Sequence, residues 1–195
     1  MPWSPLGRSV IMENMTIETD VRIPQMTFDA HGELAIAPSP TSSQHDFDFF
    51  AGKWKLRNRR LRSRLVGCTD WDEFDSTQEM YQILGGIGNI DNFLATFDGQ
   101  PFEGMTVRLF NPNTRLWSIY WADSAEGRMQ PPVVGSFVDR IGHFFTKDTH
   151  NERQVITVFR WDARDPHAPV WSQAMTPDNG QTWEWNWFMY MTRMN

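Results

Sequence analysis

Three residues of this chain could do acid–base chemistry on a small molecule: Arg108, Asp123 and His143. A histidine opposite a buried carboxylate can move protons near neutral pH. Cyclisation, isomerisation and dehydration can rely on one or two such groups in a cavity that holds the reactive conformer. Each residue also has a plainer interpretation: Arg108 as a surface cation on a strand, Asp123 as the cap of a turn, and His143 as a structural histidine.

The sequence carries no established catalytic motif. No spacing is typical of a Ser-His-Asp site, a Cys-His site, a phosphate-binding loop or a metal site, so no metal ligand is predicted. Cys68 is the only cysteine, which excludes an intrachain disulfide and a thiolate cluster. The acids beside Cys68 disfavour a reactive thiolate.

Large aromatic and sulfur-containing side chains are abundant, with 10 Trp, 14 Phe and 11 Met in 195 residues. Such side chains fill β cores and also line apolar cavities. A ligand pocket is mostly apolar and has a few placed polar groups. Asn89 can also be a turn residue, because it follows Gly-Gly-Ile-Gly. The predicted polar ligand-binding residues are Asn89, Arg108, Gln173 and Asn186, with Asp123 beside them, and the predicted walls are Trp117, Trp121 and Trp171.

Short strand-like segments separated by turns must position these residues. Strong turn signals stand at 85–89, 98–99, 111–114 and 177–180, and the spacing of about 8–12 residues is typical of a sandwich or barrel. The chain shows about ten such segments and no helical period beyond a short turn at 46–51. The pattern predicts an all-β fold, a ten-stranded antiparallel up-and-down barrel that leaves no exposed edge.

Alternate residues of a barrel strand point inward. If Trp54 points inward, Leu56 and Asn58 follow it. Both faces of the segment 181–193 are apolar enough to line the interior. The odd-numbered face is favoured because it ends in Arg193, and it comprises Trp183, Trp185, Trp187, Met189, Met191 and Arg193.

The chain divides into an extension at 1–44 and a barrel domain at 45–195. The extension holds five prolines and ends in Ala-Pro-Ser-Pro-Thr-Ser-Ser-Gln, which is typical of a linker. The segment 26–36 could form a small hairpin within it. The start of the chain lacks the basic and apolar regions of a secretory signal, and no apolar run could span a bilayer. A cytoplasmic location is the resulting expectation.

A basic run at 53–64 holds seven of the 18 cations, and five acids follow between Asp70 and Glu79. In a hairpin turning near Gly67, the two segments would match in charge on the outer face of a sheet. The net charge of −6 also disfavours a nucleic-acid partner. The predicted pairs are Arg64–Asp70, Arg62–Asp72, Arg59–Asp75 and Lys55–Glu79.

The sequence of Gly52 and Trp54 at the start of the first strand resembles the calycins, the superfamily of lipocalins and fatty-acid-binding proteins. The resemblance implies that Arg193 lies over Trp54 and plugs one end of the barrel. A closer resemblance is to a largely uncharacterised lipocalin-like family, which implies the fold but no settled reaction. The matching segments are His-Asp-Phe-Asp-Phe through Trp54, Gly85–Asn89, Arg115–Ser124 and Asp178–Arg193.

Two ligand classes known among calycins fit this chain less well. Fatty-acid-binding proteins often end in an Arg-x-Tyr pair that grips a carboxylate, and no such pair stands at this C-terminus. Haem-binding nitrobindin-like barrels use a late histidine, for which His143, His150 and His167 are the candidates. No cofactor is predicted, and haem ranks behind the other ligands.

Three hypotheses of function remain open at the level of sequence. The leading one is binding of a small hydrophobic or aromatic molecule in the barrel cavity. The alternative is an enzyme of specialised metabolism that uses the same cavity for cyclisation, isomerisation or dehydration. The third is a structural or interaction protein, and a homodimer stays open under each.

Overall fold

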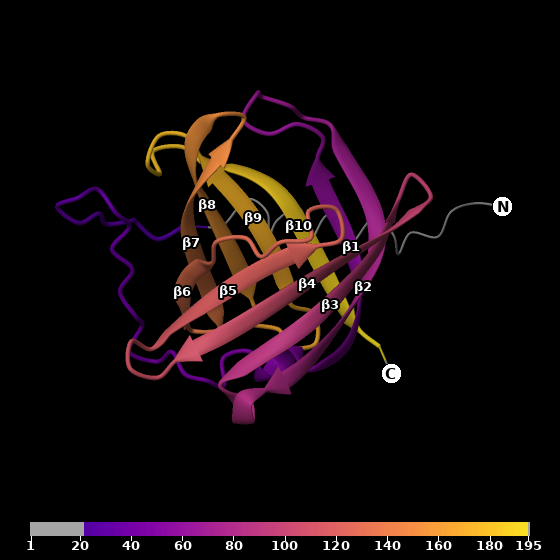
Figure 1. The fold of residues 1–195 in the computed structure, drawn as a ribbon, viewed down its shortest axis with the longest axis horizontal. Helices are drawn as coiled ribbons and strands as arrows, with labels where there is room; N and C mark the ends of the chain where they lie inside the picture. The colour runs from indigo at the N-terminus through magenta and orange to yellow at the C-terminus, as the bar shows by residue number, and fades with distance from the viewer. Residues whose placement is uncertain (1–21, 195) are drawn as a thin grey trace.

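The computed structural model describes residues 22–194, and ten antiparallel strands form one closed barrel in it (Figure 1). Neighbours in the sequence are neighbours in the barrel, and β10 closes it by pairing with β1. The predicted all-β up-and-down barrel is therefore confirmed. The strands are β1 (Gly52–Leu61), β2 (Trp71–Ile83), β3 (Gly88–Phe97), β4 (Gln100–Asn111), β5 (Leu116–Asp123), β6 (Val133–Val138), β7 (Ile141–His150), β8 (Arg153–Asp162), β9 (Val170–Thr176) and β10 (Glu184–Arg193).

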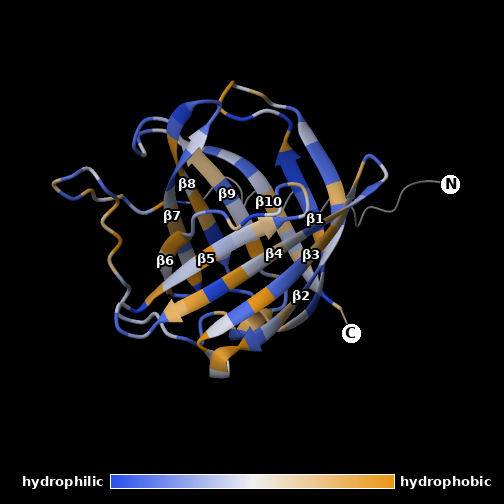
Figure 2. Cartoon of the chain, in the orientation of Figure 1, coloured by the Kyte–Doolittle hydropathy of each residue, from blue (hydrophilic) through white to orange (hydrophobic). Residues whose placement is uncertain are grey.

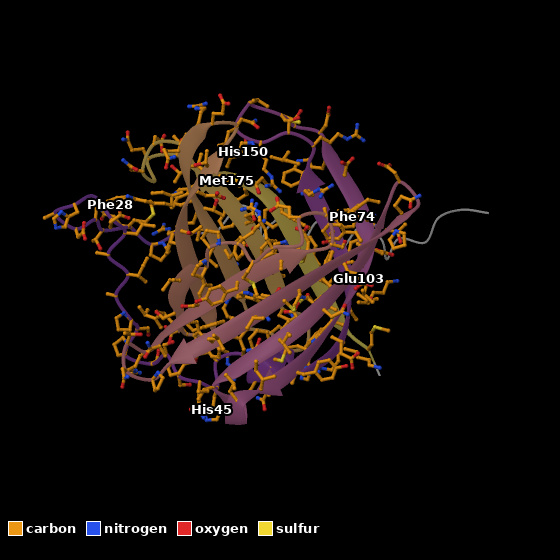
Figure 3. The ribbon with its side chains drawn as sticks, viewed as in Figure 1. Phe28, His45, Phe74, Glu103, His150 and Met175 are labelled. Atoms are coloured by element: carbon orange, nitrogen blue, oxygen red, sulfur yellow. The ribbon has the colours of Figure 1, made fainter. Side chains whose placement is uncertain are left out.

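The two ends of the barrel differ. The closed end is the one where β1 begins and β10 ends, and the short 3-10 helices η1 (Asp48–Phe50) and η2 (Leu84–Gly86) lie there. The open end is formed by the connections at 62–70, 98–99, 124–132, 151–152 and 177–183. In Figure 3, His45 at the closed end and His150 at the open end mark opposite sides of the molecule. Within residues 22–194, no helix is long and apolar enough to cross a membrane.

Aromatic side chains fill the closed end. Phe47 and Phe50, on either side of the start of η1, are fully buried against the inward-facing rings of Trp54 and Trp161. Trp54 also donates a hydrogen bond from its indole nitrogen to the carbonyl oxygen of Phe50, at 2.8 Å. Buried aromatic side chains of this size dominate core energetics, so this end is a packed plug.

The outward face of β1 carries most of the basic run, as predicted. Its cations pair with acids of β2, for example Arg57 with Glu73 at 2.6 Å and Arg62 with Asp72 at 2.7 Å. Figure 2 shows the open-end half of β1 as hydrophilic. The predicted register is wrong by two residues, since Arg57 lies opposite Asp75, because the connection at 62–70 is longer than a tight turn.

One part of the alternation predicted for 181–193 is also wrong. The pairing of β10 with β9 shifts between Trp185 and Trp187, so Asn186 forms a β-bulge. The bulge moves Trp183 and Trp185 to the outside of the barrel, while Trp187, Met189 and Met191 face inward as predicted.

Residues 22–44 run along the outside of the barrel. Phe28 bridges to Leu34 in the small hairpin predicted at 26–36, which projects from the barrel in Figure 1. Ile23 and Met26 pack on an outer cluster that includes Val158 of β8. The described part of the extension thus covers the outer face of β7, β8 and β9, and the expectations for 1–21 lie outside the described residues.

Candidate functional site

A cavity of about 380 Å³ lies inside the barrel, between the aromatic plug and the open end. Its volume falls within the range of about 300–1,000 Å³ that small-molecule sites occupy. Its walls are mostly apolar rings and methionines contributed by most of the strands. The wall residues are Phe93, Phe97, Phe102, Trp121, Phe159, Trp161, Trp171, Trp187, Met189 and Met191, and the polar lining residues are Arg60, Arg64, Gln78, Thr106, Asp123, Gln130 and Gln173.

Trp121 and Asp123 form one wall of the cavity, as predicted from their shared face on β5. The indole nitrogen of Trp121 donates to Asp123 at 2.9 Å, and the backbone N–H groups of Ala125 and Glu126 donate to the same carboxylate. Burial opposes ionisation of Asp123, but these hydrogen bonds outweigh it and lower the pKa of the carboxyl group. Asp123 is thus a fixed anion that caps a turn and orients an indole ring.

Gly104 makes the position of the Trp121 ring possible. A Cβ atom at Gly104 would lie 2.0 Å from the far edge of that ring. Only glycine therefore leaves room for the edge of the indole ring against β4. The position of Trp121 in the cavity wall thus depends on Gly104, which has no side chain that sequence reasoning could identify as functional.

The opposite wall contains Trp171 and Gln173 of β9. Gln173 donates from Nε2 to the side-chain oxygen of Asn186 at 2.8 Å, and both side chains are buried. Asn186 is the bulge residue of β10, so this amide pair fixes the place where the strand changes face. Trp171 and Gln173 line the cavity, whereas Asn186 does not line it and positions Gln173 through this hydrogen bond.

Arg108 and Asn89 lie deeper than the cavity and do not line it. Nη1 of Arg108 donates to Asp91 at 2.5 Å and to Asn89 at 3.0 Å, and the Arg108 and Asp91 side chains are almost completely buried. The guanidinium also lies 5.1 and 5.3 Å from the ring centroids of Phe47 and Phe50. Arg108 is thus a neutralised cation that supports the plug.

His143 lies on the outer side of the barrel wall and not in the cavity. It stands opposite Arg160 in the pairing of β7 with β8, and its Nε2 atom is buried without a hydrogen-bond partner. Burial lowers the pKa of His143 to about 4, and the charge of Arg160 adds to this effect, while Asp162 opposes it. His143 is therefore a neutral imidazole, separated from Asp123 and Arg108 by the barrel wall.

Trp117 and Arg193 belong to the closed end. Trp117 donates from its indole nitrogen to Asp46 at 3.1 Å and packs edge-on against Phe47. The guanidinium of Arg193 lies 4.2 Å from the ring centroid of Trp54 and donates to the carbonyl oxygens of Phe49 and Ala51.

Gly52 joins this arrangement through its backbone. Its φ of +100° favours glycine, and a Cβ atom there would lie 3.4 Å from the guanidinium of Arg193. Gly52, Trp54 and Arg193 thus lie together at the closed end.

Arg60 and Arg64 are the two cations among the cavity residues that the sequence pattern did not predict. Arg60 faces inward because it continues the alternation of Trp54, Leu56 and Asn58 along β1. That alternation could have identified it, but the cationic neighbours of Arg60 hid it within an outward-facing run. Arg64 lies in the connection after β1, where no strand period applies.

The three histidines considered for haem all lie away from the cavity lining. His143 is on the outer side of the wall, His150 is at the open rim in a separate groove, and His167 is in the connection between β8 and β9. Among residues 22–194 no group of three or more His, Cys, Asp or Glu side chains is placed to hold a metal ion.

No protein-family model matches the chain, and no curated protein matches it either. Among solved structures, the chain is similar to the S-type phycobiliprotein lyase CPES from Guillardia theta. The match has a TM-score of 0.56 and 9% sequence identity, and it covers 80% of this chain and 94% of that one. At this identity the likeness concerns the fold, which is a calycin-like barrel.

Proposed function

We propose that the protein binds a small apolar or aromatic molecule in the barrel cavity. The observation that carries the proposal is the cavity of about 380 Å³, walled by rings of Trp121, Trp171 and Trp187 above a packed plug. A barrel that served only as a scaffold would gain stability by filling this space, because unfilled apolar volume costs stability. The structural neighbour is named a phycobiliprotein lyase, so a barrel of this fold can act on a small molecule, which supports the proposal.

The acid–base alternative finds less support in the geometry. Of Arg108, Asp123 and His143, only Asp123 lines the cavity, and its oxygens are taken by three N–H donors. Arg108 is neutralised by Asp91, and His143 lies on the outer side of the wall. We therefore propose binding and derive no reaction.

Titration with a neutral fluorescent dye such as N-phenyl-1-naphthylamine tests this proposal. We expect saturable binding of one dye per chain, with quenching of tryptophan fluorescence because four indoles line the cavity wall. Thr106→Phe places a ring in the cavity, and it should weaken binding by at least about tenfold, since one lost contact worth 1.4 kcal/mol is a factor of ten.

Val107→Phe is the matched control, because Val107 is the next residue of β4 and faces outward. It should leave the affinity for the dye unchanged. The proposal fails if the folded protein binds no neutral apolar dye, or if the two substitutions weaken binding equally. Native mass spectrometry of protein from the producing cell would then show whether a resident molecule of other chemistry is present.

A further inference from the structure

Two arginines meet at the open end of the cavity. Arg60 is the penultimate residue of β1 and faces inward. Its guanidinium lies 5.4, 5.0 and 5.4 Å from the ring centroids of Phe74, Phe97 and Trp187. Arg64 lies in the following connection and lines the same cavity. Both side chains are half-buried, so both charges are partly removed from water.

These two side chains also line a second hollow on the rim. That groove has a volume of about 410 Å³, and Arg62, Ser63 and His150 are among its other lining residues. Arg60 and Arg64 therefore stand where the interior cavity meets the outside. A molecule that enters the cavity from this groove passes both guanidinium groups.

Neither guanidinium has an acidic partner within residues 22–194, in contrast to Arg57 and Arg62 of the same run. Acids do act on Arg64 from a distance, but they are hydrogen-bonded elsewhere. Glu184 accepts from the backbone N–H of Leu65 at 2.7 Å, and Asp148 accepts from the backbone N–H of Thr149 at 2.7 Å. Burial lowers the pKa of Arg64, and the nearby charge of Arg60 lowers it further.

Placing two like charges side by side in a half-buried position costs stability unless something compensates it. The rings around Arg60 contribute cation–π attraction but offer no hydrogen-bond acceptor. A planar guanidinium presents donors in a fork that matches a carboxylate. Both guanidinium groups thus face the cavity mouth without a carboxylate partner among the described residues, and their donors match an anion with two oxygen acceptors.

We infer that the ligand of this cavity is an apolar or aromatic carboxylate, whose rings pack against the tryptophan walls and whose carboxylate lies between Arg60 and Arg64. This inference rests on the proposed function and adds the charge and the orientation of the ligand. The apolar part enters first and lies toward the plug, while the carboxylate stays at the open end. Asp123 makes no ion pair with these guanidiniums among the described residues, and its oxygens accept from Trp121 and two backbone N–H groups.

Pyrenebutyrate and its methyl ester test the inference, because they share their apolar part and differ in charge. We expect the wild-type protein to bind the carboxylate at least about tenfold more tightly than the ester, which is the factor given by one charge-assisted hydrogen bond. Arg60→Gln and Arg64→Gln should each remove most of this preference, which is measured as the ratio of the two affinities in each variant. Arg60→Lys should retain part of it, since the charge stays and the fork is lost.

Arg62→Gln is the matched control in the same run, since Arg62 points outward and pairs with Asp72. It should leave the preference intact. Saturable ester binding, together with a cooperative urea unfolding transition, shows that each variant is folded and that its cavity is accessible. Equal affinities for carboxylate and ester in the wild type would overturn the inference while leaving the proposed function standing, and so would a preference that survives Arg60→Gln and Arg64→Gln. Binding of neither molecule would instead contradict the proposed function.

Discussion

The closed and open ends of the barrel use the same kinds of side chain in opposite ways. At the closed end, aromatic rings pack into a plug, and Arg108 and Arg193 each donate to oxygens of the protein. At the open end, aromatic rings surround a cavity, and Arg60 and Arg64 face it without an acidic partner among the described residues. Arginine over aromatic rings is therefore no signature of a site by itself. The difference lies in whether the guanidinium already has an oxygen acceptor in the protein.

The largest test of this contrast is to remove the partner of the buried arginine with Asp91→Asn. The Asp91 carboxylate accepts from Arg108 at 2.5 Å and from Gln78 at 2.6 Å, and the side chain is inaccessible to water. An amide there leaves the guanidinium charge unpaired, which should cost about 3–5 kcal/mol of stability. Urea unfolding followed by tryptophan fluorescence measures this loss.

Two further variants show whether the pair is the cause. Asp75→Asn removes an exposed partner of Arg57 and should cost at most about 1 kcal/mol, as surface ion pairs do. The double variant Asp91→Leu with Arg108→Leu removes both buried charges and should be more stable than Asp91→Asn alone. A double variant that is less stable than the single one would show that Arg108 is not a structural cation.

The second test lowers the pH, which should reduce the free energy of unfolding through His143 on the outer wall near the closed end. Its pKa is about 4 in the folded protein, below the ordinary value of 6.5, because burial disfavours the charged ring. The unfolded chain therefore takes up a proton as the pH falls through 6.5, while the folded protein stays neutral until about 4. Stability is complete above pH 6.5 and falls by up to about 3 kcal/mol between pH 6.5 and 4.

Urea unfolding at pH 7, 5.5 and 4.5, compared with the same series for His143→Gln, measures this slope. The variant should lose most of the pH dependence in this window. Asp162 cannot produce the slope, because hydrogen bonds from Arg164 and Arg160 outweigh its burial and lower the pKa of its carboxyl group to about 2. Its contribution is lost only as the pH falls below about 4 toward 2. An unchanged slope in His143→Gln would mean that other groups carry the acid response.

The third test removes the arginine that fastens the plug, with Arg193→Met. The variant keeps the aliphatic stem over Trp54 but leaves the carbonyl oxygens of Phe49 and Ala51 without their donors. Hydrogen bonds from a charged group contribute about 1.5–3 kcal/mol, and water can replace part of them at this exposed position, so the expected loss is about 1–2 kcal/mol. Thermal unfolding measures it, and Arg193→Lys should restore part of the stability. A variant as stable as the wild type would show that Arg193 does not stabilise the plug.

The sequence predicts the barrel well because turns and alternation are local properties. The turn at 177–180 and the alternating segments between turns mark the strands directly, and closure follows because it removes exposed edges. The register of β1 with β2 depends instead on the path of residues 62–70, which no local pattern determines. The bulge at Asn186 likewise reverses the inward face within one strand, and a strict period of two cannot anticipate it.

The site is predicted less completely, for reasons that differ from residue to residue. Trp121 and Trp171 follow from alternation and line the cavity. His143 could not be placed, because the phenylalanines after it are apolar on both faces of β7. Arg60 required only one more step of the alternation from Trp54, whereas the position of Arg64 depends on a loop.

The smallest expected loss of stability is that of Arg60→Gln. It bears most directly on the comparison of the two ends, because no acid among the described residues pairs with Arg60. Arg60→Gln forfeits cation–π attraction to the rings of Phe74, Phe97 and Trp187, worth about 0.5–1 kcal/mol at a partly exposed site. It also removes the repulsion of Arg64, which opposes that loss. The free energy of unfolding should therefore change by less than about 1 kcal/mol, although the same substitution is expected to abolish the preference for a carboxylate. Arg108→Gln changes the same residue type but leaves Asp91 buried without its cation, so it should cost several times more. Urea unfolding of the two variants side by side measures the difference, and equal losses would mean that the open end is as structural as the closed one.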